Sequence, residues 1–390
     1  MVNAFQHAAL PQLIFGPGSI SRLPELVKPY GTDCLILTGK SSFTSQPVWG
    51  EVQFQLKAEG ISHAHEVISG EPSPLWIDKI VNRTRNKNPK VVIAIGGGSV
   101  LDAGKAVSAM LCHPHPTKSY LEGVGDKKPS AEKIPFIAIP TTAGTGSEAT
   151  KNAVLSEVGP QGYKKSLRHD AYVPEVALID PKLALSASPQ VTAAAGMDAF
   201  TQLLEAYLST KASPFTDALA FEGLSHIQKG LLTAVSEGNN LPARSHMAYA
   251  AYLSGVCLAN AGLGLVHGYA SSIGGKIKIP HGALCGTLMG VVNEMTVEKI
   301  LSGTPAPIAM EKYARVGKLF VGEKTYQEVD YAKALIALIQ EWTETLALPK
   351  LGTYGLTEES IAPISSATAL KNHPVIFSQE EKEEVLRRRI

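Results

Sequence analysis

Residues 91–105 read VVIAIGGGSVLDAGK. The apolar run 91–95 has the length of a strand, and it predicts a strand that is buried on both faces of a parallel sheet. Three glycines and Ser99 follow directly, and a helical stretch comes next. Because glycine lets the backbone approach a phosphate closely, and the first N–H groups of a helix offer donors, this stretch predicts a pyrophosphate site.

Named nucleotide-binding patterns do not match this stretch. Leu101 stands where G-x-G-x-x-G needs glycine, and Gly104-Lys105 lacks the other P-loop residues at their spacings. Taken alone, the glycine run has a tight turn as its alternative interpretation. A second loop, TTAGTGSE at 141–148, follows the apolar run 134–139. Both loops are expected at the carboxyl edge of one sheet, which favours a ligand site over two plain turns.

Hydrophobic patterning divides the chain in two. Before Asp180 and Pro181, short apolar runs alternate with helical stretches, and these runs occupy residues 34–38, 91–95, 134–139 and 176–179. Beyond that point the apolar residues recur at intervals of three and four within Ala/Leu-rich stretches, at 193–208, 215–236 and 243–261. We expect a doubly wound α/β domain over 1–182 and an all-helical domain over 183–390, with a solvated helix at 378–390.

Composition limits the partners and the compartment. A chain of 390 residues is long enough for two domains with a ligand-binding cleft between them. Its 36 basic and 35 acidic residues leave a net charge of +1, which gives no support for nucleic acid or a membrane surface as a partner. Four separated cysteines indicate neither a zinc knuckle nor a disulfide scaffold. Without a leader pattern or a long apolar run, we expect a cytoplasmic protein.

The helical half carries a possible set of metal ligands. Asp198 and Gln202 lie four residues apart and therefore share one face of a helix. His267 and His281 each stand among glycines and apolar residues. One carboxylate and two imidazoles suit Fe(II) or Zn(II), with an amide oxygen or water completing the shell. Each residue singly has a structural alternative: the carboxylate as the partner of a helix end, each histidine as a hydrogen-bonded residue.

Six segments together resemble the iron-containing (group III) alcohol dehydrogenases over nearly the whole chain: FGPGSI, GGGSVLDAGKA, IPTTAGTGSE, VPEVALIDP, GMDAFTQLLEAY and HGYASSIGGKIKIPHG. The resemblance implies the dehydroquinate synthase-like fold, in which a Rossmann-like N-terminal domain precedes a helical C-terminal domain. It also implies a nicotinamide cofactor, a divalent metal, and hydride exchange with a small alcohol or aldehyde in the cleft between the domains. A homodimer or larger homo-oligomer is expected on the same ground.

The same resemblance implies the coenzyme contacts. The pyrophosphate loop corresponds to Gly97, Gly98 and Ser99, and Asp102 matches the acidic position beside the nicotinamide. The second cofactor loop corresponds to Thr141, Thr142, Thr145 and Ser147. Lys164 falls at the lysine near the nicotinamide ribose.

Two positions depart from the family pattern. Asp198, His267 and His281 match three metal ligands, but the fourth, normally histidine, is Gln202. An amide is a weaker donor than imidazole, so the ion is left open between Fe(II), Zn(II) and another metal. Ser271 stands where many members have a histidine that is assigned to proton relay. Proton delivery through water or a hydroxyl is therefore expected.

Coenzyme preference depends on the end of the first long strand. Members that prefer NAD have an aspartate there, whereas this chain has Gly39, Lys40 and Ser41. A cation and hydroxyls suit a 2′-phosphate, which favours NADP(H) over NAD(H). The alternative is that Lys40 only lies on a solvated loop.

The sequence thus predicts a dehydrogenase or aldehyde reductase in which the metal polarises the substrate oxygen while the nicotinamide exchanges hydride. Its catalytic candidates are Asp102, Asp198, His267 and His281. Two alternatives remain open at this point. One is a lyase related to dehydroquinate synthase, and the other is a nucleotide-binding protein with a decayed catalytic site.

Overall fold

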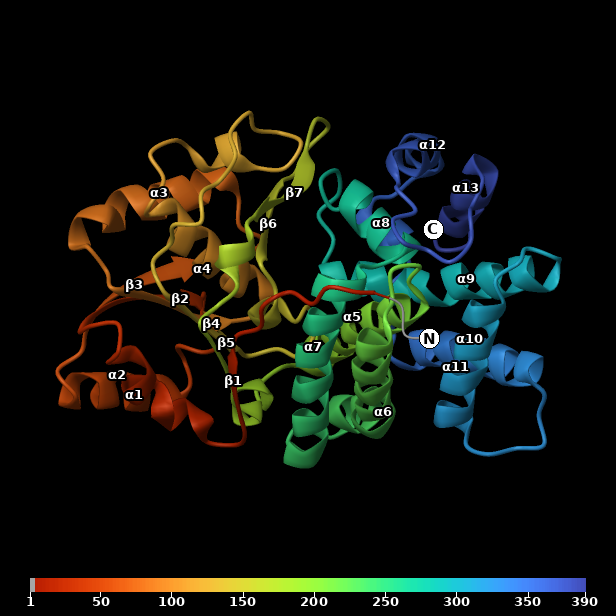
Figure 1. Cartoon of the computed structure of the whole chain (residues 1–390), viewed down its shortest axis with the longest axis horizontal. Helices are drawn as coiled ribbons and strands as arrows, with labels where there is room; N and C mark the ends of the chain where they lie inside the picture. The colour runs from red at the N-terminus through yellow and green to blue at the C-terminus, as the bar shows by residue number, and fades with distance from the viewer. Residues whose placement is uncertain (1–3) are drawn as a thin grey trace.

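The computed structural model describes residues 4–390, in which an α/β part and a helical part lie side by side (Figure 1). Six parallel strands form one sheet in the order β1-β8-β5-β4-β2-β3. Their bounds are Gln12–Phe15 for β1, Asp33–Gly39 for β2, Ser62–Ile68 for β3, Val91–Gly96 for β4, Phe136–Pro140 for β5 and Val176–Ile179 for β8. The predicted parallel sheet is confirmed, and β1 and β3 are strands that the sequence analysis did not predict.

Helices cover both faces of this sheet. On one face lie α1 (Leu23–Val27) and α2 (Pro47–Ala58), and on the other α3 (Pro74–Thr84) and α4 (Gly98–Met110). Successive side chains of a strand point to opposite faces, so Ile36 packs in the first layer and Leu37 in the second. This two-sided burial explains why the central strands are continuous apolar runs.

The strand order reverses direction at β2, which lies between β3 and β4. Thr38 of β2 pairs with Ile95 of β4, and Gly96 pairs with Pro140 of β5. The loops after β2, β4 and β5 therefore start at the same edge of the sheet. Ligands of open α/β sheets bind outside the carboxyl ends of the strands, at such a reversal point.

A separate antiparallel hairpin, which the sequence analysis missed, consists of β6 (Asn152–Glu157) and β7 (Tyr163–Arg168). It reaches the helical part, where the Gly159 N–H donates to the Gly275 carbonyl over 3.1 Å. Because it carries Lys164, the hairpin decides where that side chain lies.

Residues 189–390, all of which are described, contain helices and no strand, which confirms the predicted helical half. The α-helices are α5 (Pro189–Leu208), α6 (Pro214–Ser236), α7 (Leu241–Ala261), α8 (Leu265–Ile273), α9 (His281–Leu301), α10 (Pro307–Val321), α11 (Glu328–Thr345), α12 (Glu358–Ala367) and α13 (Gln379–Arg387). Helix α5 begins four residues before its apolar pattern because Ser188 caps it and Pro189 starts it. Within residues 4–390 no single helix is long and apolar enough to cross a membrane, although the bent pair α7 and α8 passes that test together.

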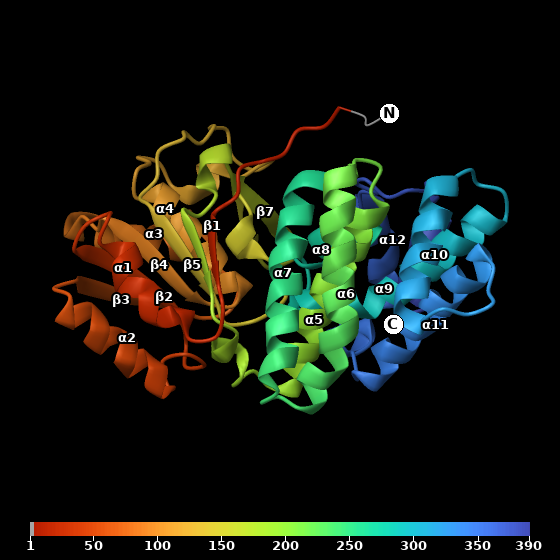
Figure 2. The ribbon, with the colours of Figure 1, turned by 60° about the horizontal axis from the view of Figure 1, so that its bottom comes forward.

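The described segment before β1 and the C-terminal end of the chain both contact the helical part (Figures 1 and 2). The segment before β1 runs across to α7, where the Ala8 N–H donates to Asn260 Oδ1 over 2.7 Å. The expectation of a solvated terminal helix is wrong for one face of α13, because Val385 and Leu386 are fully buried. Arg389 is also buried, and its Nη2 donates to Thr287 Oγ1 over 2.7 Å.

Candidate active site

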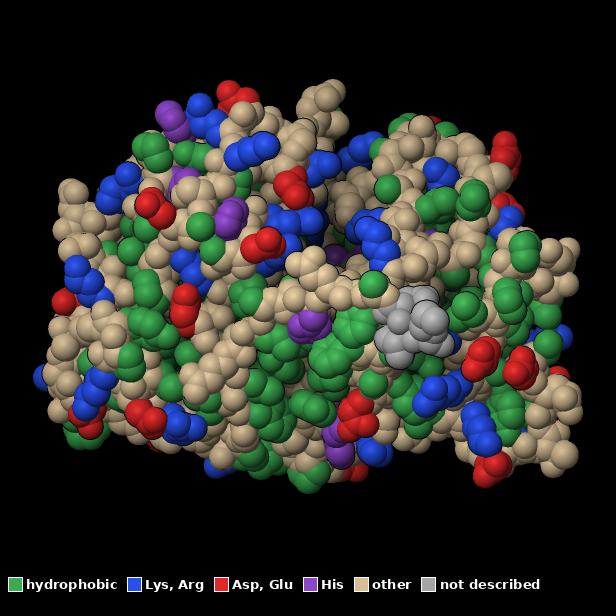
Figure 3. All heavy atoms as spheres, viewed as in Figure 1, with side chains coloured by type: hydrophobic (Ala, Val, Ile, Leu, Met, Phe, Trp, Pro, Cys, Tyr) green, Lys and Arg blue, Asp and Glu red, His purple; other side chains and the backbone are tan. Residues whose placement is uncertain are grey.

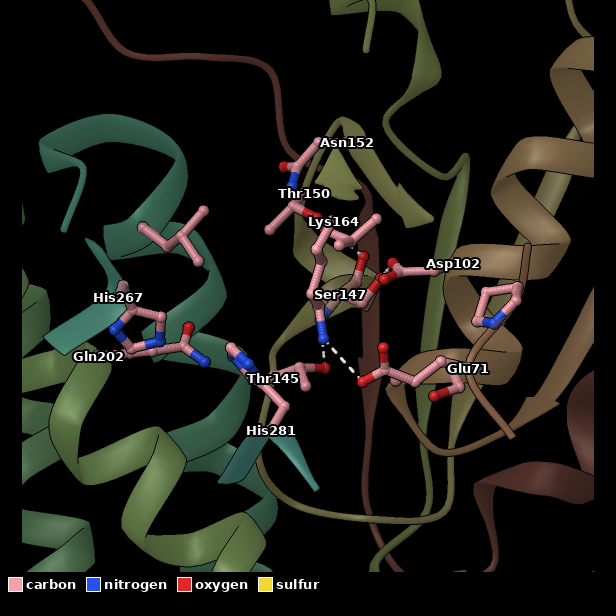
Figure 4. A pocket seen from close by; sticks show the side chains of 15 residues that line it. Glu71, Asp102, Thr145, Ser147, Thr150, Asn152, Lys164, Gln202, His267 and His281 are labelled. Carbon is pink, nitrogen blue, oxygen red and sulfur yellow. Dashed lines mark hydrogen bonds and ion pairs between the residues drawn. The ribbon is translucent and has the colours of Figure 1, made fainter. Parts of the chain in front are cut away.

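A pocket lies between the α/β part and the helical part, where the molecular surface is hollowed and basic side chains stand at the rim (Figure 3). In Figure 4, Gln202, His267 and His281 enter it from the helical side, opposite Asp102 and Ser147. The structure brings nine of the predicted site residues to this pocket: Gly98, Ser99, Asp102, Thr145, Ser147, Lys164, Gln202, His267 and His281.

The two glycine-rich loops touch each other at the sheet edge. Gly97 caps α4, and a Cβ added to Gly98 would lie 2.7 Å from Thr145 Oγ1. A Cβ on Gly97 would lie 3.3 Å from Thr142 Oγ1. Gly97, Thr141 and Thr142 therefore belong to the same loop pair, although they do not line the pocket itself.

Gly146 joins the second loop to the helical part. Its φ of 60° is left-handed, and a Cβ there would lie 2.5 Å from the Ala251 carbonyl oxygen and the Gly255 nitrogen of α7. Only glycine combines this conformation with such a close backbone approach. The loop that lines the pocket is thus held against α7.

Asp102 is held in place by a buried network. Ser147 Oγ donates to Asp102 Oδ1 over 2.6 Å, and Lys105 Nζ donates to the Ser147 carbonyl over 2.9 Å. The ammonium also donates to Thr150 Oγ1 and to the Asn152 carbonyl. Burial lowers the pKa of Lys105 to about 8 and raises the pKa of Asp102. Lys105 thus links α4 to the second loop, a role that the sequence analysis did not assign.

Lys164 reaches the pocket from β7 and pairs there with Glu71, whose Oε1 lies 2.7 Å from Lys164 Nζ (Figure 4). Burial acts to raise the pKa of Glu71, but the charge and hydrogen bond of Lys164, together with a hydrogen bond from Ser156, outweigh it and hold that pKa below its usual range. Glu71 was missed because it precedes α3 in a loop with no motif around it.

The candidate metal ligands converge from three helices. Asp198 and Gln202 lie on α5, His267 on α8, and His281 is the first residue of α9. Asp198 Oδ1 lies 3.4 Å from His267 Nε2 and 3.6 Å from His281 Nε2. Within residues 4–390, the buried atoms Asp198 Oδ1 and Gln202 Oε1 have no hydrogen-bond partner. Unpartnered buried acceptors beside two imidazoles fit a divalent cation.

Neighbouring groups set the orientation of the His267 ring and the pKa values of His281 and Asp198. Glu205 Oε2 lies 2.7 Å from His267 Nδ1, which leaves Nε2 facing Asp198. Burial lowers the pKa of His281 to about 4, so its ring is in the neutral form that binds metals. Burial acts to raise the pKa of Asp198. The charges of His281 and His267 and a hydrogen bond with His267 together outweigh burial and keep this pKa below its usual range.

Sequence analysis missed two residues of this centre. Glu205 is one, and Cys285 is the other: its Sγ lies 3.6 Å from His267 Nε2 and 3.8 Å from His281 Nε2. Cys285 follows His281 by four residues, so the helical spacing was a signal for it. Glu205 follows Gln202 by three residues on the same helix and was open to the same argument.

Four further residues discussed from the sequence lie outside the pocket lining, as do Gly97, Thr141, Thr142 and Asp198. Gly39, Lys40 and Ser41 stand at the end of β2, and the last two are exposed. Ser271 is also exposed, and its Oγ donates to the His267 carbonyl over 2.9 Å. Its hydroxyl is therefore engaged with the backbone of its own helix.

Comparison with known proteins matches this arrangement to one family. The model described as "Iron-containing alcohol dehydrogenase" matches residues 11–181, and "Fe-containing alcohol dehydrogenase family, C-terminal" matches residues 192–389. The probable alcohol dehydrogenase EutG of Escherichia coli is 33% identical over 95% of this chain and 91% of its own length.

Solved structures share the fold over the full chain. A 1,3-propanediol oxidoreductase superposes with a TM-score of 0.89 at 28% identity, covering 100% of both chains. A sulfoacetaldehyde reductase from Bifidobacterium kashiwanohense, solved in complex with NAD+, superposes with a TM-score of 0.83 at 25% identity, covering 99% of both chains.

Proposed function

This chain belongs to the iron-containing alcohol dehydrogenase family and is a metal-dependent alcohol dehydrogenase, and from that premise we propose which of its residues do the chemistry. The observation that carries the proposal is the pocket in which two glycine-rich loops meet an Asp/His/His cluster with unpartnered buried acceptors. The family assignment favours the dehydrogenase over the lyase alternative.

A bound nicotinamide coenzyme would be held by the loops at the carboxyl edge of the sheet. Its pyrophosphate binds at the N-terminus of α4, where Gly98 and Ser99 offer backbone N–H groups, and Thr145 and Ser147 line the facing loop. Gly97 and Thr142 bring the two loops into contact, and the Thr141 N–H donates to the Gly96 carbonyl over 3.0 Å. Asp102 and Lys164 then stand at the nicotinamide end of the coenzyme, on the side of the pocket that faces the histidines.

Asp198, His267 and His281 hold the divalent ion, with Gln202 facing the same space. When bound, the ion acts as a Lewis acid on the substrate oxygen, and the nicotinamide exchanges hydride with the adjacent carbon. The protein residues orient the substrate between these two groups. The side chains of Asp198 and His267 are buried, which strengthens their electrostatic effect, whereas the side chain of His281 is 25% exposed at the pocket.

A proton must enter or leave with the substrate oxygen. The exposed Ser271 donates to a backbone carbonyl, so we place the proton path through water in the pocket, with the Lys164 and Glu71 pair at its side. The substrate is a small alcohol or the corresponding aldehyde.

We favour NADP(H) as the coenzyme because Lys40 and Ser41, which follow Gly39 at the end of β2, are exposed and could contact a 2′-phosphate. This position lies at the reversal point of the sheet, where the ribose of a dinucleotide binds in such folds. A cytoplasmic location and a homodimer or larger assembly stay predictions, as do the domain limits 1–182 and 183–390.

Replacing His267 with Ala tests the proposal. Because a catalytic metal supplies several kcal/mol of transition-state stabilisation, turnover should fall at least about 10³-fold with a panel of alcohols and aldehydes. Coenzyme affinity, measured by quenching or enhancement of NAD(P)H fluorescence, should stay within about twofold. The exposed His115→Ala serves as the matched control. Unchanged turnover in His267→Ala would remove the metal mechanism, and a wild-type protein that binds coenzyme but oxidises no alcohol with any metal would indicate a decayed site.

A further inference from the structure

Cys285 lies one helical turn after His281, and its thiol belongs to the same cluster of candidate metal ligands as Asp198, His267 and His281. The side chain is fully buried. One atom each from Asp198, His267, His281 and Cys285 can be chosen so that all four lie within 4.8 Å of one another. Three helices, α5, α8 and α9, thus direct a carboxylate, two imidazoles and a thiol at one point.

Four of the six separations between these atoms match the edges of a tetrahedral site, and the other two are no longer than 4.8 Å. Bonds of about 2.3 Å to sulfur and about 2.0 Å to nitrogen or oxygen would place sulfur about 3.5 Å from nitrogen, and nitrogen about 3.3 Å from oxygen. Cys285 Sγ lies 3.6 Å and 3.8 Å from the two Nε2 atoms. Asp198 Oδ1 lies 3.4 Å and 3.6 Å from the same two atoms. All four separations are within about 0.3 Å of these edges.

Gln202 is the other candidate for the fourth protein ligand of the divalent ion. Its Oε1 is buried and has no partner within residues 4–390, so it is available to a cation. A neutral amide, however, donates far less to a divalent transition metal than a thiolate does. Gln202 also lines the pocket, whereas Cys285, like Asp198, does not.

We propose that Cys285, in place of Gln202, is the fourth protein ligand, so that the site is an Asp/His/His/Cys centre. This inference rests on the proposed metal function and specifies the ligand set. A thiolate is a soft ligand, so the centre should favour Zn(II) over harder ions. On metal binding the thiol proton is released to solvent. The amide of Gln202 then remains in the pocket, facing the substrate.

X-ray absorption of the wild-type protein loaded with one equivalent of Zn(II) tests this without any substitution. We expect one sulfur neighbour at about 2.3 Å, together with nitrogen and oxygen neighbours at about 2.0 Å. A shell of nitrogen and oxygen alone would overturn the proposal while leaving the metal mechanism in place. Failure to retain any divalent ion would overturn both.

Variants loaded with Co(II) give a second readout. Wild type should show a near-ultraviolet band from thiolate-to-cobalt charge transfer. Cys285→Ala should lose the band and bind Zn(II) at least about 100-fold more weakly in competition with a chromophoric chelator, whereas Gln202→Ala should keep the band. Cys257→Ala is the matched control, since Cys257 is equally buried in a helix but lies outside the cluster. A band that persists in Cys285→Ala would contradict the assignment.

Discussion

Glu205 Oε2 lies 2.7 Å from Nδ1 of His267, and the other carboxylate oxygen of Glu205 accepts from the Val266 N–H over 2.7 Å. One buried side chain therefore holds both the imidazole and the start of the helix that carries it. Hydrogen bonding at Nδ1 also fixes which ring nitrogen faces the cluster. The metal ligand depends on a residue 62 positions earlier in the chain.

Replacing Glu205 with Gln should weaken metal binding. The amide keeps the shape of the side chain but removes the negative charge that orients His267 and increases its basicity. Zn(II) affinity, measured by chelator competition, should fall about 10- to 100-fold, while NAD(P)H affinity is unchanged. Glu222→Gln is a suitable control, because Glu222 also contacts a histidine, His226, at 3.1 Å but away from the pocket. Equal metal affinity in wild type and Glu205→Gln would refute the orienting role.

Replacing Lys40 with Ala should discriminate between the coenzymes. If its ammonium contacts the 2′-phosphate, the KM for NADPH should rise about tenfold, since a charge-assisted contact at an exposed site contributes about 1.4 kcal/mol. The KM for NADH should not change. Steady-state kinetics with both coenzymes measure this, with the exposed Lys57→Ala as control. Unchanged KM values for both coenzymes would assign Lys40 to the surface loop alone, and an equal rise in both would contradict a contact with the 2′-phosphate.

Glu148 should make stability fall as the pH rises. Burial raises its pKa to about 7 from an ordinary value of 4.5, so between these values the folded state binds more protons than the unfolded state. The stabilisation is complete below about pH 4.5 and is lost as the pH rises through about 7, with an upper bound of about 3 kcal/mol. The melting temperature of Glu148→Gln minus that of wild type should therefore increase between pH 5 and pH 8.

Thermal unfolding of both proteins across this range measures the difference. The exposed Glu51→Gln should follow wild type at every pH. A constant offset between Glu148→Gln and wild type from pH 5 to pH 8 would show that Glu148 is ionised throughout.

Local patterns were sufficient for the central strands and for the helical half, but not for β1, β3 or the β6 and β7 hairpin. The run 91–105 becomes strand β4, a glycine loop and helix α4 because each step is dictated by neighbours in sequence: apolar residues, then glycines, then a helical stretch. Asp198 and Gln202 share a face for the same reason, a spacing of four on one helix. The sequence alone thus determined that an α/β half precedes a helical half, and it predicted the two coenzyme loops and four candidate metal ligands, Asp198, Gln202, His267 and His281.

Only the tertiary structure decided which side chains meet. His267 and Cys285 come from different helices, and the packing of α8 against α9 brings their side chains within 3.6 Å. Ser271 follows His267 by one turn of α8 and is exposed whereas His267 is buried, and Lys164 meets Glu71 only because strand β7 brings it to the pocket. Contacts between segments far apart in the chain depend on how buried faces pack, and sequence spacing does not encode that geometry.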